Sequence, residues 1–157
     1  MPDSEIGEES HAVRGPVDRG ALIDFRETIT QREPLATGEL DDFLDPSVLY
    51  IHLEDGVGEA DSGRFDVVWT TRDDYNVHYT DDVRNLRWDV HPHDYPKPPE
   101  ARHFHPPPDA SKDPDLVVDS CIKVPGIVLV ALATLKLWRT AYERGSFEGI
   151  NQFIDPP

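Results

Sequence analysis

The residues of this chain with the greatest chemical potential gather in one short segment, positions 87–105. The segment holds four of the seven histidines, two arginines and the Asp89 carboxylate. A histidine of near-neutral pKa can take a proton from a ribose 2′-hydroxyl or return one to a leaving oxygen, and an arginine can stabilise a charged phosphate. The segment could therefore bind and cleave RNA without a metal. The candidate residues are Arg87, Asp89, His91, His103 and His105 for catalysis, and His78, His93 and Arg102 for substrate binding.

Two other interpretations of this segment stay open. Arg87 and Asp89 could form a surface ion pair of little energetic value, with the histidines bonded to the backbone of a proline-rich loop. Two His-x-His pairs could instead bind zinc, iron or nickel, with Asp89 or Glu100 adding a carboxylate. The cupin pattern needs a glutamate shortly after such a pair, where this chain has Lys97 and Pro98. We therefore expect no metal and no cofactor.

Alternating residue types indicate the strands that would position these side chains. Four strand-like runs follow one another with short polar links, which favours an antiparallel meander. The runs are 47–54, 64–71, 75–80 and 84–90. Bulky apolar side chains share one parity within the last three runs, so they should form one apolar face. The opposite face, which we expect to be exposed to solvent, then carries His78, Arg87, Asp89 and His91.

Helical patterns flank the predicted sheet. Asp18 could cap a helix that ends before Pro34, and a strand over residues 22–28 is the alternative. Residues 34–46 are typical of a loop or a short helical turn. An apolar run from Ile127 to Tyr142 predicts a second helix that covers the apolar face of the sheet.

The ends of the second helix and the chain between sheet and helix can also be assigned. Pro125 suits the first turn of the helix, and Gly145 suits the position just after its end. Residues 92–124 are predicted to be a proline-stiffened connection. The fold class is therefore α+β: an antiparallel sheet of about four strands, with an N-terminal helix and a C-terminal helix packed on one face.

Composition limits the class of protein. The chain has 157 residues and a net charge of −16, with few lysines and many acidic residues, a composition that resembles a halophilic, haloarchaeal cytosolic protein. Residues 1–17 are polar and aperiodic and predict a disordered acidic tail, followed by a single domain over 18–157. Cys121 is the single cysteine, which fits a cytoplasmic location. The longest apolar run, 124–135, is shorter than the roughly 20 residues that span a bilayer, so we expect no membrane association.

The order of motifs resembles one known family. The run Arg87-Trp88-Asp89, followed by His91 and His93 and then by the sequence HFHPPPDA from position 103, is similar to TumE-like proteins in a form found in uncharacterised haloarchaeal proteins. The resemblance covers roughly residues 64–142, and it departs from the family where Val90 replaces a frequent asparagine.

The resemblance implies the toxin of a toxin–antitoxin pair whose partner is a helix-turn-helix antitoxin, with RNA as a candidate substrate. The residues to which the family's motif carries over are Arg87, Asp89, His91, His93, His103 and His105. The alternative is a non-enzymatic interaction protein or a metal-binding protein. Oligomeric state and substrate do not follow from these patterns.

Overall fold

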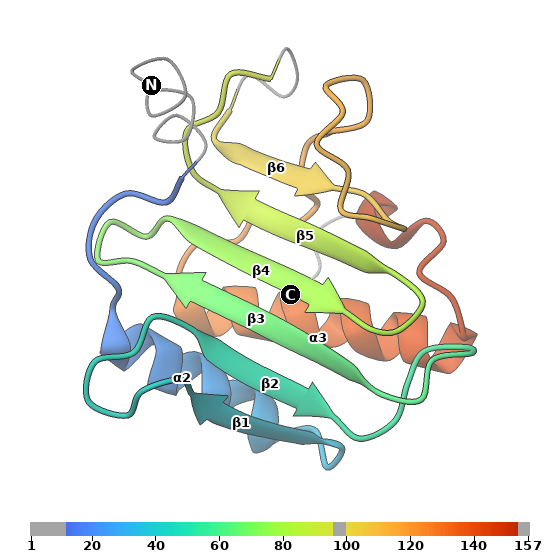
Figure 1. Ribbon diagram of the computed structural model, residues 1–157, viewed down its shortest axis with the longest axis horizontal. Coiled ribbons are helices and arrows are strands. Elements are labelled where there is room, and N and C mark those ends of the chain that lie inside the picture. The colour runs from blue at the N-terminus through green and yellow to red at the C-terminus, as the bar shows by residue number, and fades with distance from the viewer. Residues whose placement is uncertain (1–11, 96–99, 154–157) are drawn as a thin grey trace.

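The computed structural model describes residues 12–95 and 100–153 and has the α+β fold expected from the sequence (Figure 1). Within these residues, six strands form one sheet, and two helices and a short 3₁₀ helix complete the fold. The elements are α2 (Arg19–Thr30), β1 (Ala36–Leu40), β2 (Leu49–Leu53), β3 (Gly63–Trp69), β4 (Tyr75–Thr80), β5 (Asn85–Val90), β6 (Arg102–His105), α3 (Ile127–Arg144) and η1 (Ile150–Gln152).

The sheet is an antiparallel meander in which each strand pairs with the next along the chain, in the order β1 to β6. The four predicted strands correspond to β2, β3, β4 and β5. The two outer strands were not predicted: β1 lies within the expected loop at 34–46, and β6 lies within the proline-rich connection. Both are short edge strands, and pairing with a neighbour outweighs their weak local preference for extended structure.

The two helices begin and end close to the predicted positions. Asp18 caps α2, and its side chain accepts a hydrogen bond from the Ala21 backbone N–H at 3.1 Å, so the alternative strand over residues 22–28 is wrong. Helix α3 ends at Gly145 in the left-handed conformation that glycine tolerates best. Pro125 is not in the first turn, because Gly126 is the residue before the helix.

The core lies between the sheet and the helices, which both cover the same face (Figure 1). The predicted parity holds, since every second side chain of β3, β4 and β5 points into this core, and only Val90 is partly exposed. Its largest side chains include three tryptophans from three elements, all at most 2% exposed: Trp69, Trp88 and Trp138. None of the helices formed by residues 12–95 and 100–153 is long and apolar enough to cross a membrane.

The segment before α2 is attached to the sheet. Arg14 contacts Asp74 through its backbone N–H and its guanidinium, and Val17 forms a bridge to Thr70. The disordered tail was predicted for residues 1–17, of which 1–11 lie outside the described residues. The contacts of residues 14 and 17 show that ordered packing begins before residue 18.

Candidate functional site

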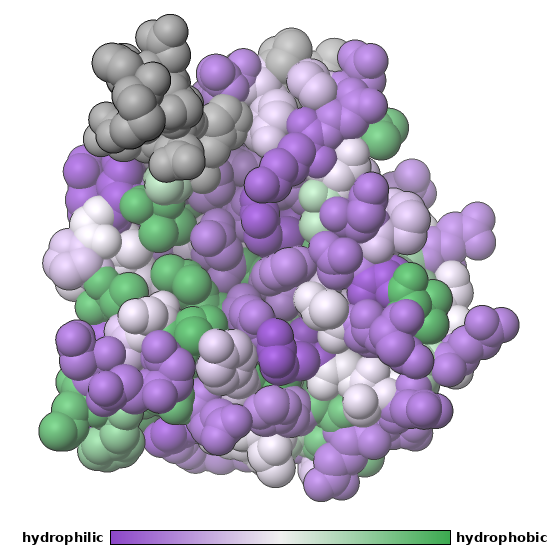
Figure 2. Space-filling model, in the orientation of Figure 1, coloured by the Kyte–Doolittle hydropathy of each residue, from purple (hydrophilic) through white to green (hydrophobic). Residues whose placement is uncertain are grey.

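Strand register brings the predicted catalytic residues together at the β5–β6 edge. Asp89 lies opposite His103, and Arg87 lies opposite His105. All four side chains point away from the helices. Successive side chains of a strand point to opposite faces, and the residues between them, Trp88 and Phe104, point into the core. Hydrophilic residues predominate on this side of the molecule (Figure 2).

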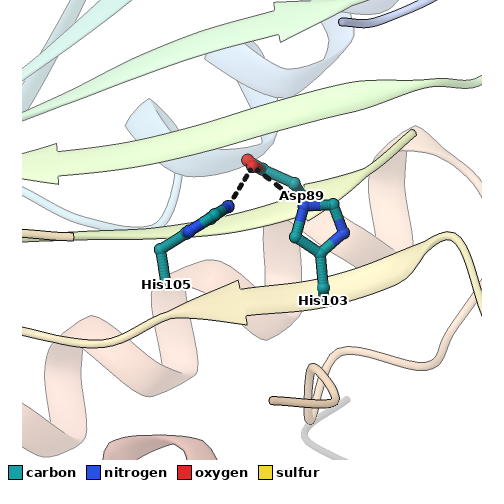
Figure 3. Close-up of side chains that lie close together, drawn as sticks. All are labelled: Asp89, His103 and His105. Atoms are coloured by element: carbon teal, nitrogen blue, oxygen red, sulfur yellow. Dashed lines mark ion pairs between the residues drawn. The ribbon is translucent and has the colours of Figure 1, made fainter. Parts of the chain in front are cut away.

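A single carboxylate oxygen lies at the centre of the group. Asp89 Oδ2 accepts a hydrogen bond from Arg87 Nε at 2.7 Å. The same oxygen lies 3.2 Å from His105 Nε2, 3.3 Å from His91 Nε2 and 3.5 Å from His103 Nε2. Figure 3 shows the imidazoles of β6 directed toward this carboxylate. We call these five residues the Asp89 cluster.

The predicted solvent exposure of this face is wrong at the Asp89 cluster. Asp89, His103 and His105 are each at most 1% exposed, whereas the Arg87 side chain keeps 22% of its surface accessible. The chain that follows β5 turns back over the strands: the Tyr95 ring lies 5.7 Å from that of His105. Local alternation cannot anticipate such a cover, which comes from a loop outside the strands.

Each imidazole of the Asp89 cluster is held by a backbone carbonyl. The Nδ1 atoms of His91, His103 and His105 lie 2.8–2.9 Å from the carbonyl oxygens of Pro92, Ala101 and Ser111, in that order. A carbonyl oxygen only accepts, so each Nδ1 carries the proton, an assignment made from the hydrogen-bond network. The lone pair of a neutral ring then lies on Nε2, which faces Asp89.

The surroundings favour the ionised form of Asp89 and the neutral form of His103. Burial alone would raise the pKa of Asp89, but hydrogen bonds from the adjacent imidazoles, which need a proton on Nε2, and the charge of the Arg87 guanidinium outweigh it and hold the pKa well below its usual range. Burial lowers the pKa of His103 despite the nearby carboxylate. The Asp89 cluster thus combines an ionised carboxylate with at least one imidazole that tends to stay neutral.

The three residues predicted to bind substrate lie at different distances from this group. His78 is on the same face, opposite Arg87, and its Nε2 contacts Asn85 Oδ1 at 3.1 Å. The His93 ring lies 4.5 Å from the His103 ring. Arg102 pairs with Val90 in the register, which places it on the face toward the helices and away from the Asp89 cluster.

Asn76 was not among the predicted site residues, although it lies opposite Asp89. With its amide oriented to satisfy both of its polar atoms, its nitrogen donates to Asp89 Oδ1 at 3.0 Å. The strand pairing of residues 75–80 with 84–90 could have revealed it. The three carbonyls that hold the histidines give no signal in the sequence, because every residue has one.

The comparisons with known proteins agree with the motif order. The family model described as Toxin TumE matches residues 21–133, which extend from α2 to the middle of α3 and include the whole sheet with the Asp89 cluster. No curated protein and no solved structure matches the chain. The family match covers well over half of the sequence, and the chain therefore belongs to the TumE toxin family.

Proposed function

We propose that this chain is the toxin of a toxin–antitoxin pair, that it cleaves RNA, and that the Asp89 cluster is its active site. The family supplies the first part of the proposal. The observation that carries the second part is the convergence of one guanidinium and three imidazoles on a buried carboxylate. Ionisable groups whose pKa values are strongly perturbed by burial and by specific charged neighbours are common at functional sites.

The residues have the chemical properties that phosphodiester cleavage requires. Arg87 is the most accessible charged group of the Asp89 cluster, and it contacts Asp89 through Nε. The two terminal nitrogens of a guanidinium can pair with a phosphate. The Nε2 atoms of His103 and His105 can take up or release a proton, since each Nδ1 is held by a carbonyl. Asp89 orients these groups.

The experiment is regulated expression of the wild type and of single variants in a host without the cognate antitoxin. We expect the wild type to arrest growth and to fragment cellular RNA, and we expect Arg87→Ala, His103→Ala and His105→Ala to do neither. His52→Ala is the matched control, since His52 is an exposed histidine on β2 of the same sheet. Equal arrest by all variants would refute the assigned site, and arrest with intact RNA would refute the assigned substrate.

We also propose that the partner is a helix-turn-helix antitoxin and that the pair acts in the cytoplasm. The buried free thiol of Cys121 fits a reducing compartment. Co-expression of a neighbouring gene of that class should suppress arrest, and the two proteins should purify together. Arrest that persists although such a neighbour is co-expressed would count against this partner.

A non-enzymatic role is the second candidate, and the burial of the imidazoles is the observation that favours it. With His103 and His105 at most 1% exposed, RNA can reach these rings only if the covering chain moves. In that case the toxin would act by binding a partner, and the Asp89 cluster would fix the β5–β6 edge in place. Purified protein that leaves RNA intact but still binds the antitoxin would support this alternative over cleavage.

A further inference from the structure

We propose that Asp89, His103 and His105 are the protein ligands of one divalent transition-metal ion, with zinc as the first ion to test. Their ligand atoms, one from each residue, all lie within 4.8 Å of one another, and all three residues are buried. The site is the one to which the proposed function assigns RNA cleavage. Metal binding itself does not require that function, and only the role of the ion in cleavage rests on it.

The first argument is the direction of the lone pairs. The Nδ1 protons of His103 and His105 point to backbone carbonyls, so each ring in its neutral form directs the lone pair of Nε2 at the Asp89 carboxylate. Among the described residues, both Nε2 atoms are buried without a hydrogen-bond partner. Lone pairs that face a carboxylate repel it unless a cation lies between them, and a metal ion is such a cation.

The second argument is distance. A charge-assisted N–H···O bond is about 2.7–2.9 Å long. The Nε2 atoms of His105 and His103 instead lie 3.2 and 3.5 Å from Asp89 Oδ2. Two ligands of a tetrahedral zinc ion with bonds of about 2.0–2.1 Å are separated by about 3.3–3.4 Å. The observed separations therefore match two ligands of one ion better than a hydrogen bond.

The third argument is the set of hydrogen bonds that hold the ligand side chains in position. Metal-binding histidines characteristically donate their other N–H to a carbonyl or carboxylate, which fixes the ring and its tautomer. Here Ala101 and Ser111 supply those carbonyls, and Arg87 and Asn76 bond the Asp89 carboxylate. The ligand orientations are thus set without the ion.

The ligand chemistry selects the class of ion. Two imidazoles and one carboxylate suit zinc, iron or nickel, whereas magnesium and calcium prefer oxygen ligands. His91 Nε2 touches the same carboxylate oxygen at 3.3 Å, and we assign it as a neighbour of the ligand set. Three protein ligands leave a coordination position for water. With an ion bound, His103 and His105 Nε2 would be ligands and would no longer transfer protons, and this water would provide the activated nucleophile in the proposed cleavage.

The test is direct titration of purified, chelator-treated protein with zinc by calorimetry, and with cobalt by visible absorption. We expect saturation at about one ion per chain and a melting temperature that rises on addition of zinc. His103→Gln, His105→Gln and Asp89→Asn should each weaken binding by more than about 100-fold, since loss of a supporting residue alone costs about 10–100-fold.

Two controls separate ligand loss from damage to the fold. Asp74→Asn makes the same substitution at a buried aspartate outside the site, and His52→Gln makes the same substitution at an exposed histidine. Both should bind zinc as tightly as the wild type. The proposal is overturned if folded wild type binds no zinc or cobalt, or if the site variants bind as well as the controls.

The experiments distinguish failure of the proposed RNA cleavage from failure of the proposed metal site. Wild type that binds zinc through these residues but leaves RNA intact supports the metal site and refutes cleavage. Cleavage by chelator-treated protein with no bound metal ion, together with absent zinc and cobalt binding, supports the proposed function and overturns the metal site.

Discussion

Two aspartates, one in the sheet and one in the turn before β4, expose almost no surface but have very different neighbours. Asp74, before β4, and Asp89, in β5, are each 1% exposed. The Asp74 carboxylate accepts hydrogen bonds from the backbone N–H of Arg14 and from Nε and Nη2 of its guanidinium, at 2.8–3.0 Å. The Asp89 carboxylate accepts one such bond from Arg87, while imidazole nitrogens occupy the space around the same oxygen.

This difference separates a structural carboxylate from one that is arranged to bind. At Asp74 the donors are complete, so burial of the charge is compensated within the protein. At Asp89, Arg87 and Asn76 donate to the carboxylate, but the nearest nitrogens of β6 have no proton to give in their neutral form, so any further compensation comes from added protons or a cation. Burial alone therefore does not identify a functional aspartate, but the chemistry of its neighbours does.

The largest expected effect is on activity. Asp89→Asn should reduce RNA cleavage by about 10²–10⁴-fold, because it removes the charge around which the imidazoles are arranged. Asp74→Asn should leave the cleavage rate of the folded protein unchanged. Initial rates on a defined RNA, measured for both variants at equal folded concentration, test this contrast. Similar losses in both variants would remove the distinction between the two aspartates.

The second effect is on the free energy of unfolding, and its dependence on zinc should differ between the two sites. Asp74→Ala should lower the free energy of unfolding by about 1–2 kcal/mol, with or without zinc, because it removes the charge-assisted hydrogen bonds from Arg14, whose side chain is 44% exposed. Asp89→Ala should abolish the stabilisation by zinc. Urea unfolding with zinc and with chelator measures both effects. A zinc-dependent cost of Asp74→Ala would contradict the structural role of Asp74.

The third effect is a pH dependence of the Asp74 contribution. Burial raises the pKa of Asp74, but the hydrogen bonds and charge of Arg14 outweigh it, and His91 acts in the same direction as Arg14, so the pKa is below its ordinary value. A carboxylate of this kind stabilises the protein above its unfolded pKa of about 3.9 and loses that effect as the pH falls through the folded value.

The measurement compares wild type with Asp74→Asn in urea at several pH values, with chelator present. The difference in free energy of unfolding should be constant from about pH 7 to pH 5 and shrink below about pH 4. A difference that grows on acidification would show that Asp74 is not held in its charged form by Arg14.

The smallest effect should come from an exposed pair of the same chemical type. Arg64 Nε donates to Asp66 Oδ1 at 2.6 Å on β3, but the two side chains are 46% and 25% exposed. Asp66→Ala should change the free energy of unfolding by no more than about 0.5 kcal/mol, because solvent screens the pair. The same urea titrations supply this value. A cost as large as that of Asp74→Ala would mean that burial does not distinguish these pairs.

The sequence predicted the elements whose signals are local. The Asp18 cap and the apolar period of α3 identified the helices, and the strict alternation in β3, β4 and β5 identified one covered face. Strands β1 and β6 could not be predicted, because their extended form depends on pairing with β2 and β5.

For the candidate site, too, the sequence predicted what depends on local patterns and missed what depends on loop packing. Strand parity placed Arg87 and Asp89 on one face, and the two histidines of β6 follow the same alternation. Burial of the Asp89 cluster and the carbonyl partners of its rings depend on loop packing, which has no period in the sequence. For that reason the sequence favoured proton transfer without a metal, whereas the orientation of the rings led us to propose an ion.

Strand β6 has four residues that alternate between the two sides of the sheet, and Phe104 packs against Trp88 between His103 and His105. A single inserted or deleted residue at this strand would exchange the sides, placing an imidazole in the apolar interior and a phenyl ring against Asp89. Changes in the length of the chain on either side of β6 do not have this consequence. Homologous toxins should therefore vary in the length of the surrounding loops while the spacing His-x-His in this strand stays fixed.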